Sequence, residues 1–162
     1  MDAELYAKFL SGQPKLYRFA YSLTKNVSDA KDIHQETLIR IWEMREQWGE
    51  WRNFEAYSMR ITRTVYLNFS KAKNRHPHLD LNEVTEKPVQ NDIENSITLN
   101  DLKYTFNSII SNLPELQQNI LYLREIEELE YKEIAQVLDI SESQVKVYLF
   151  RGRQYIKNNF RK

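Results

Sequence analysis

A stretch near the C-terminal end, residues 131–153, carries side chains whose chemistry suits contact with DNA. Amide and hydroxyl groups can hydrogen-bond to base edges in the major groove, and cations can bind phosphates. Both kinds of group fall on one face of a predicted helix, which has no carboxylate after Glu142. The residues of this outward face are Ser143, Gln144, Lys146, Val147, Phe150 and Arg151. Most charged faces only solvate a surface helix, so the elements that position these side chains decide the interpretation.

The same stretch contains two helical patterns joined by a short turn. In the turn, Asp139 can adopt the left-handed conformation and Ser141 is a good helix N-cap. Gln144 follows Ser141 by three residues, which is the spacing of a capping box. The apolar positions are Ile134, Ala135 and Leu138 on the first helix, and Val145, Leu149 and Gly152 on the second. These features predict a helix-turn-helix whose second helix binds DNA.

A second candidate surface lies in the first half of the chain, where Trp48 and Trp51 flank a glycine in a short connection. Aromatic rings beside a basic helix can stack on unpaired bases. The helix that follows offers Arg60, Arg63, Thr64, Asn68, Lys71 and Lys73. For any single aromatic residue here, packing in a core is the simpler interpretation. As a group beside a carboxylate-free stretch, they favour contact with single-stranded DNA.

The charges balance over the 162 residues, with 23 basic and 23 acidic side chains, but they are unevenly distributed. Residues 56–79 and 145–162 contain no carboxylate, and acidic segments lie between them. Two separate basic stretches suit a protein that contacts a polyanion at two places. There is no cysteine and no apolar run long enough to span a membrane. The sequence thus predicts a cytoplasmic protein without membrane insertion.

Hydrophobic periodicity predicts an all-α fold of two small helical domains. Helices are expected over residues 3–25, in which Pro14 can introduce a kink or break, from Ser28 as a cap onward, and from Asn53 as a cap to about residue 74. These would form a three-helix bundle, and four helices, including the helix-turn-helix, would form the second domain. The expected boundaries are 1–75 for the first domain, 76–95 for an acidic flexible linker, and 96–162 for the second domain.

Catalytic and metal sites receive little support. The one cluster with suitable chemistry is Asp29, Asp32 and Glu36 with His34, but helical spacing separates His34 from Glu36. The first-turn acids already complement a helix dipole. His76 and His78 lack a third ligand nearby. We therefore predict no catalytic residue, no metal and no cofactor.

Three stretches, residues 16–42, 54–75 and 113–153, together resemble bacterial sigma-70-type RNA polymerase sigma factors. More narrowly, the chain resembles the extracytoplasmic-function (ECF) group, which keeps only regions 2 and 4. The resemblance implies a protein that directs core RNA polymerase to specific promoters and melts DNA for transcription initiation. The open alternative is a stand-alone helix-turn-helix regulator, in which residues 1–75 sense a ligand or dimerise.

The resemblance also implies roles for individual residues. The face of the second helix would dock on the coiled coil of the polymerase's largest subunit, through Asp29, Asp32, Gln35, Glu36, Ile39 and Arg40. The −10 element would be recognised and melted by Trp51, Asn53, Tyr57, Arg60, Arg63, Thr64, Asn68 and Lys71. The −35 element would be read by the outward face of residues 143–151 defined above. Further partners implied are the polymerase flap and an anti-sigma factor.

Two departures from the family pattern lie in region 4. Where a glycine usually precedes the helix-turn-helix, this chain has Glu128, followed by Leu129 and Glu130. Where the family commonly has Thr-Val-Lys-Ser-Arg, residues 144–148 read Gln-Val-Lys-Val-Tyr. The second departure removes one arginine, so we expect the −35 sequence to differ from that of better-known members.

Overall fold

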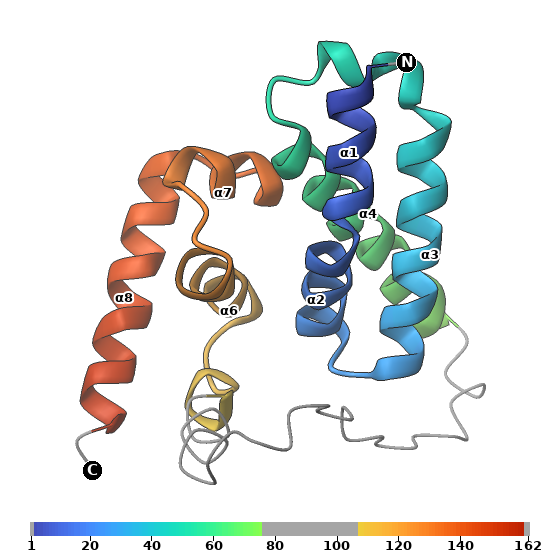
Figure 1. Ribbon diagram of the computed structural model, residues 1–162. Helices are drawn as coiled ribbons and strands as arrows, with labels where there is room; N and C mark the ends of the chain where they lie inside the picture. Colours follow the sequence, from blue (N-terminus) through green and yellow to red (C-terminus); the bar gives the residue numbers. More distant parts are fainter. Residues whose placement is uncertain (1, 76–106, 161–162) are drawn as a thin grey trace, which may run out of the picture. The chain divides into compact units, whose positions relative to one another are not determined.

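The computed structural model describes residues 2–75 and 107–160. Within these ranges the chain forms helices and connecting turns and contains no strand. It divides into two compact helical units, one built from the helices before residue 76 and the other mostly from those after residue 106 (Figure 1). The prediction of an all-α, two-domain fold is confirmed. The predicted linker, residues 76–95, lies outside the described residues, and the domain boundaries stay predictions.

The N-terminal unit begins with two helices, α1 (Ala3–Ser11) and α2 (Gln13–Thr24), where the sequence suggested one. The break lies at Gly12, whose N–H donates to the carbonyl of Lys8 at 2.9 Å and so closes the last turn of α1. Pro14 falls in the first turn of α2, where a backbone N–H would have no helical partner. The first member of the predicted three-helix bundle is therefore in two pieces.

Helix α3 (Val27–Glu43) begins after a tight turn. Lys25 ends α2 in the left-handed conformation, with a φ of 53°. The cap of α3 is Asn26, whose Oδ1 accepts a hydrogen bond from the N–H of Asp29 at 2.9 Å. The expectation of Ser28 as the cap was wrong, because Ser28 already lies inside the first turn of the helix.

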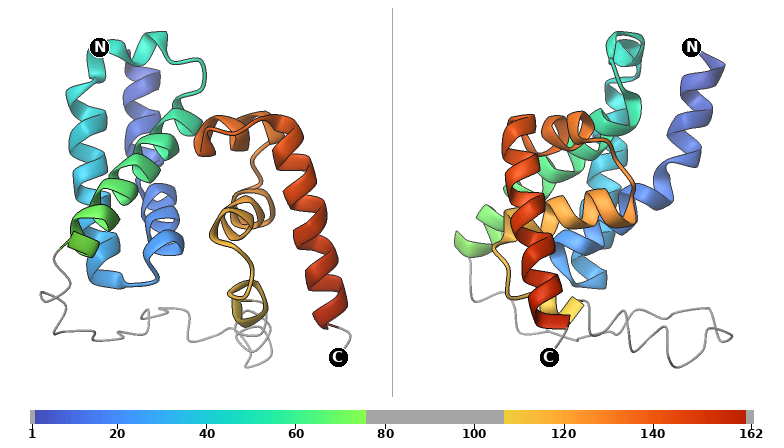
Figure 2. Two further views of the ribbon diagram at one scale, coloured as in Figure 1. Left: turned by 180° about the vertical axis from the view of Figure 1, so that it is seen from behind. Right: turned by 90° about the vertical axis from the view of Figure 1, so that its left-hand side faces the viewer.

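Helix α4 (Phe54–Arg75) completes the N-terminal unit and crosses α2 and α3 (Figure 2). Its cap is Asn53, as predicted, and Asn53 Oδ1 accepts from the N–H of Ala56 at 3.0 Å. The apolar faces of α2, α3 and α4 meet in a core in which each large side chain contributes roughly 1.5–3 kcal/mol. Its fully buried members include Phe19, Ala20, Ala30, Ile33, Ile41, Trp48, Ala56 and Met59.

The C-terminal unit is described from residue 107, and residues 107–110 are helical. Its further elements are α6 (Glu115–Leu121), the π-helical turn η3 (Tyr122–Ile126), α7 (Tyr131–Leu138) and α8 (Glu142–Phe160). Helix α8 packs on α6, and α7 leads into α8 through a tight turn (Figure 1). The core includes Leu113, Ile120, Leu121, Leu123, Leu129, Ile134, Val145 and Leu149.

The turn between η3 and α7 contains a backbone conformation that is unusual for its residue. Glu128 has a φ of 57°, in the left-handed region that glycine adopts without steric cost. Arg124 stabilises the turn, because its guanidinium donates a hydrogen bond to the carbonyl of Leu129 at 2.8 Å. The Arg124 guanidinium also lies 5.1 Å from the ring centroid of Tyr131. These contacts keep Glu128 in a conformation that its side chain disfavours.

Candidate nucleic-acid and polymerase surfaces

The turn before α8 has the predicted geometry. Asp139 adopts the left-handed conformation with a φ of 55°. Ser141 Oγ accepts a hydrogen bond from the N–H of Gln144 at 3.1 Å, and Gln144 Oε1 accepts one from the N–H of Ser141 at 2.9 Å. This reciprocal pair is a capping box and satisfies two N–H groups that a helix start leaves without partners. The first turn of α8 is thereby fixed by residues three apart in the sequence.

The inner face of α8 seats it closely on α6. Val145 and Leu149 are buried, as predicted. Gly152 is buried too, and a Cβ atom at this position would lie 3.0 Å from Cδ1 of Leu121 on α6. The absence of a side chain at Gly152 therefore allows the close approach of the two helices. This packing fixes which face of α8 points outward.

All six residues predicted to face outward on α8 are exposed. Among the nearby cations, Arg151 lies 5.9 Å from the ring centroid of Tyr148, so its stem follows the helix surface. Arg153 instead forms an ion pair with Glu125, at 2.8 Å, and this carboxylate raises the Arg153 pKa. Arg153 thus stabilises the seating of α8 on η3, whereas Lys146 and Arg151 belong to the outward face.

The two tryptophans of the connection between α3 and α4 have different environments. Trp48 lies in the short 3₁₀ helix η1 (Arg45–Glu50) and is buried, and its Nε1–H donates to the carbonyl of Ile41 at 2.9 Å. Trp51 is half-buried and stacks on Tyr57, with ring centroids 4.2 Å apart and planes 24° apart. Core packing is therefore the correct interpretation for Trp48. Trp51 and Tyr57 form an aromatic edge at the surface.

Helix α4 carries a polar stripe that continues from this aromatic edge. Arg60, Thr64, Asn68 and Lys71 are exposed and recur at intervals of three or four residues, so they share one face with Tyr57. The face opposite holds the buried side chains of α4. At about 1.5 Å per residue, the stripe extends roughly 21 Å along the helix. The structure thus places one ring pair, two cations and two neutral polar side chains in line.

Two members of the predicted −10 set lie off this stripe. Arg63 is half-buried at the side of α4. Asn53 caps the helix, as described above, so its side-chain oxygen is already engaged. The structure therefore groups six of the eight predicted residues and separates Arg63 and Asn53 from them.

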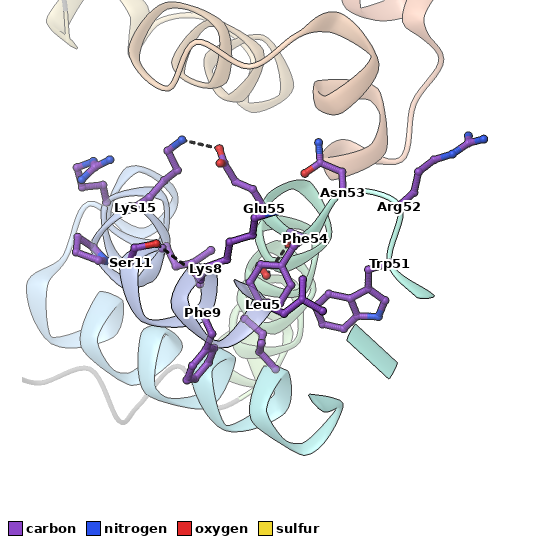
Figure 3. Close-up of a pocket in the computed structure, with 16 residues that line it drawn as sticks. Leu5, Lys8, Phe9, Ser11, Lys15, Trp51, Arg52, Asn53, Phe54 and Glu55 are labelled. Atoms are coloured by element: carbon purple, nitrogen blue, oxygen red, sulfur yellow. Dashed lines mark hydrogen bonds and ion pairs between the residues drawn. The ribbon is translucent and has the colours of Figure 1, made fainter. Parts of the chain in front are cut away.

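A pocket of about 530 Å³ opens beside residues 51–55 (Figure 3). Trp51 and Asn53 of its lining belong to the predicted −10 set, and the rest of the lining was not predicted. Side chains of α1 and α2, among them Leu5, Phe9 and Lys15, form one side of it, and Trp51 and Glu55 belong to the other. Lys15 and Glu55 form an ion pair across it. No local sequence pattern joins residues so far apart, so only the folded structure could bring them together.

The predicted polymerase-docking residues lie along α3. Asp32, Gln35, Glu36 and Ile39 are exposed on one face, and Ile39 has 53% of its surface accessible. The remaining two lie beside this face and are half-buried. Arg40 Nε contacts Glu36 Oε1 at 3.0 Å.

Asp29 forms an ion pair with a residue of another helix. Its carboxylate contacts Lys73 Nζ at 3.0 Å, which ties the first turn of α3 to the last turns of α4. Lys73 is one of the cations that the sequence placed on the DNA-binding helix. The pair could not be recognised from local spacing, since 44 residues separate its members.

His34 faces α2 rather than the carboxylates near it in sequence. Its Nε2 lies 2.9 Å from the carbonyl oxygen of Gln13, and its ring meets Tyr17 edge-on at 5.6 Å. Burial lowers the His34 pKa, and the hydrogen bond to Gln13 opposes that shift. Within residues 2–75 and 107–160, no group of three or more His, Cys, Asp or Glu side chains could hold a metal ion. None of the helices described has the length and apolarity needed to cross a bilayer.

Two family models match this chain, in the order of its two units. The model described as "Sigma-70 region 2" matches residues 9–76. The model described as "Sigma-70, region 4" matches residues 106–156. The matched residues include both candidate DNA surfaces and the exposed face of α3.

Relatives similar over most of this chain carry the name of one group within that family. The ECF RNA polymerase sigma factor SigM of Bacillus subtilis is 25% identical over 154 residues, which cover 95% of this chain and 91% of SigM. SigW of the same organism is 26% identical over 156 residues, which cover 91% of this chain and 83% of SigW.

A solved structure supports the fold. It is the sigma factor RpoE in complex with the anti-sigma factor NepR from Bartonella quintana, and it matches with a TM-score of 0.77 and 21% identity. The match covers 99% of this chain and 98% of that one. The family follows from the two family models and the relatives: the chain belongs to the sigma-70 family of RNA polymerase sigma factors, in the ECF group.

Proposed function

We propose that this chain directs core RNA polymerase to a class of promoters and helps to separate the DNA strands there. The observation that supports this best is the difference between the two surfaces. The outward face of α8 suits the major groove of a duplex, whereas the stripe from Trp51 to Lys71 suits an unpaired strand. Melting needs both, because duplex binding sets the position and capture of unstacked bases offsets a cost of a few kcal/mol.

The exposed face of α3 is the proposed docking surface for the polymerase. Ile39 supplies an apolar centre, and Asp32, Gln35 and Glu36 surround it with polar groups, which is the usual composition of a protein interface. Asp29 and Arg40 border this face. The −35 reader would act on the same enzyme near its flap. No step of this function requires a catalytic residue or a cofactor of the chain's own.

A cytoplasmic location follows from the proposal, because the polymerase and the chromosome are there. A protein that covers a DNA-binding surface or the polymerase-docking surface would control such a factor. The similar Bartonella protein was solved in complex with an anti-sigma factor. We propose a partner of that kind for this chain.

Run-off transcription with purified core enzyme tests the proposal. The full chain should give promoter-specific transcripts from some members of a promoter library, and Trp51→Ala should lower their yield. Opening the −10 region in advance, with a short mismatched bubble, should restore the yield of Trp51→Ala. A complete lack of specific transcripts would contradict the proposal. So would tight binding of the chain alone to an operator, since a stand-alone regulator would bind DNA without polymerase.

A further inference from the structure

The outward face of α8 has an apolar ridge at its centre. Val147 lies opposite the buried Val145 and Leu149, and Phe150 follows it by three residues, so both point away from the core. Val147 has 46% of its surface accessible and Phe150 has 64%, the largest exposed fraction of the large apolar side chains in the described ranges. Neither residue is part of the buried core of the unit. Their exposure side by side on the outward face of α8 therefore indicates an apolar patch that a partner can cover.

Charges beside the ridge indicate what that partner is. Lys146 and Arg151 flank Val147 and Phe150, and no carboxylate occurs from residue 145 to the end of the chain. A B-DNA major groove presents phosphates along both edges and base edges along its floor. The apolar group that this floor offers is the C5-methyl group of thymine. Cations at the sides and apolar side chains in the middle match that arrangement.

Gln144, one of the two uncharged polar residues of the outward face, is less available for reading bases. Gln144 Oε1 already accepts hydrogen bonds from the N–H of Ser141 at 2.9 Å and from its hydroxyl at 3.3 Å. A two-bond contact with adenine needs that oxygen as well as the amide N–H group. Gln144 would therefore have to weaken the capping box to make it. Discrimination between base pairs consequently depends more on the ridge.

We propose that Val147 and Phe150 recognise thymine methyl groups in the upstream promoter element. The element would then contain thymine, on one strand or the other, at the positions that face these two side chains. This inference rests on the proposed function and specifies the chemistry that the α8 surface reads.

Replacement of thymine by deoxyuridine tests the inference, because it removes only the methyl group. Holoenzyme assembled from core polymerase and the full chain would first enrich duplexes from a library with a randomised upstream element. Single thymines in the enriched element would then be changed to deoxyuridine and binding measured by competition. Loss of one contacted methyl group should weaken binding by about fourfold, the factor expected for burying one such group.

Variants assign each methyl group to a side chain. Phe150→Ala should bind thymine and deoxyuridine duplexes equally at one position, and Val147→Ala should do so at another. Phe150→Leu should retain part of the discrimination. Ile126→Ala is the matched control, because Ile126 is 55% exposed but lies in η3, outside the ridge. It should behave as the unchanged protein does.

The outcomes separate this inference from the function on which it rests. Specific transcription with no effect of deoxyuridine at any position would overturn the inference and leave the proposed function standing. So would enrichment of elements without thymine, or a loss of affinity for a protein partner in Phe150→Ala with thymine discrimination unchanged. Failure of every enriched promoter to give a specific transcript would instead overturn the proposed function.

Discussion

The two helical units position their candidate surfaces by different means. In the C-terminal unit, one helix carries the surface, and hydrogen bonds between Ser141 and Gln144 fix its start. In the N-terminal unit, the surface follows α4, but Trp51 at its start lies on a connection beside contacts between distant parts of the chain, such as Lys15 with Glu55. A surface set by a local motif should tolerate changes elsewhere in its unit. A surface that depends on contacts between helices should be disturbed by any substitution that disturbs the core between those helices.

The largest expected effect comes from the core of the N-terminal unit. Trp48→Ala removes a buried indole and its hydrogen bond to the Ile41 carbonyl. Loss of a large buried aromatic side chain costs about 3–5 kcal/mol. We expect the free energy of unfolding of this unit to fall by that amount, and DNA melting to be lost with it. Urea unfolding can be followed by the fluorescence of the tryptophans that remain, since all three lie between residues 42 and 51.

Trp51→Ala is the matched control for this change. Trp51 is half-buried at the aromatic edge, so its loss should cost far less stability while still lowering strand opening. Equal destabilisation by both variants would show that the edge belongs to the core, and the contrast between the two tryptophans would then be wrong.

The same difference explains what the sequence could predict. The helix-turn-helix was predictable residue by residue, because Asp139, Ser141 and Gln144 have local roles that follow from their types and spacing. The helices of the first half were predictable from periodicity, and Pro14 indicated where the first of them can kink or break. The structure has the break two residues earlier, at Gly12, with Pro14 in the first turn of the next helix. A glycine gives no periodic signal of its own.

The environments of single side chains were harder to predict. Trp48 and Trp51 are alike in type and three residues apart, yet one is buried and the other lies at the surface. The pocket beside Trp51 and the Asp29–Lys73 pair depend on how α2, α3 and α4 pack. The packing of helices cannot be read from residues close together in the sequence, so these features could be found only in the structure.

A smaller effect, and of opposite sign, is expected in the C-terminal unit. Glu128→Gly should raise the stability of this unit by about 0.5–1 kcal/mol, because glycine relieves the left-handed strain but makes the unfolded chain more flexible. Amide hydrogen exchange in α6 and α8 would measure the change within the unit. Asp139→Gly, at a similar φ, should gain less, since aspartate tolerates this conformation better. A destabilised Glu128→Gly would mean that the Glu128 side chain makes a contact that outweighs the strain.

A pH effect should appear in the N-terminal unit. The His34 pKa is lowered in the folded state by burial, so the unfolded chain binds this proton more readily. Stability from this group is therefore fully present above the ordinary histidine pKa and is lost as pH falls through the lower folded value. Tryptophan-monitored unfolding at pH 7.5 and pH 5.5 should show the loss. The loss should be smaller in His34→Gln, and an identical pH dependence in both proteins would exclude His34 as its source.

The smallest expected effect concerns the pair that links α3 to the end of α4. Asp29 and Lys73 are partly exposed, so Asp29→Asn should cost less than about 1 kcal/mol of stability. Reversal of the pair, with Asp29→Lys and Lys73→Asp together, should restore most of it. Because the Asp29 carboxylate is already occupied, Asp29→Asn should lower affinity for core polymerase less than Asp32→Asn, which alters an exposed carboxylate. Core-binding assays with both variants would decide this. Equal losses would make Asp29 a direct polymerase contact, and the docking surface would then extend to the first turn of α3.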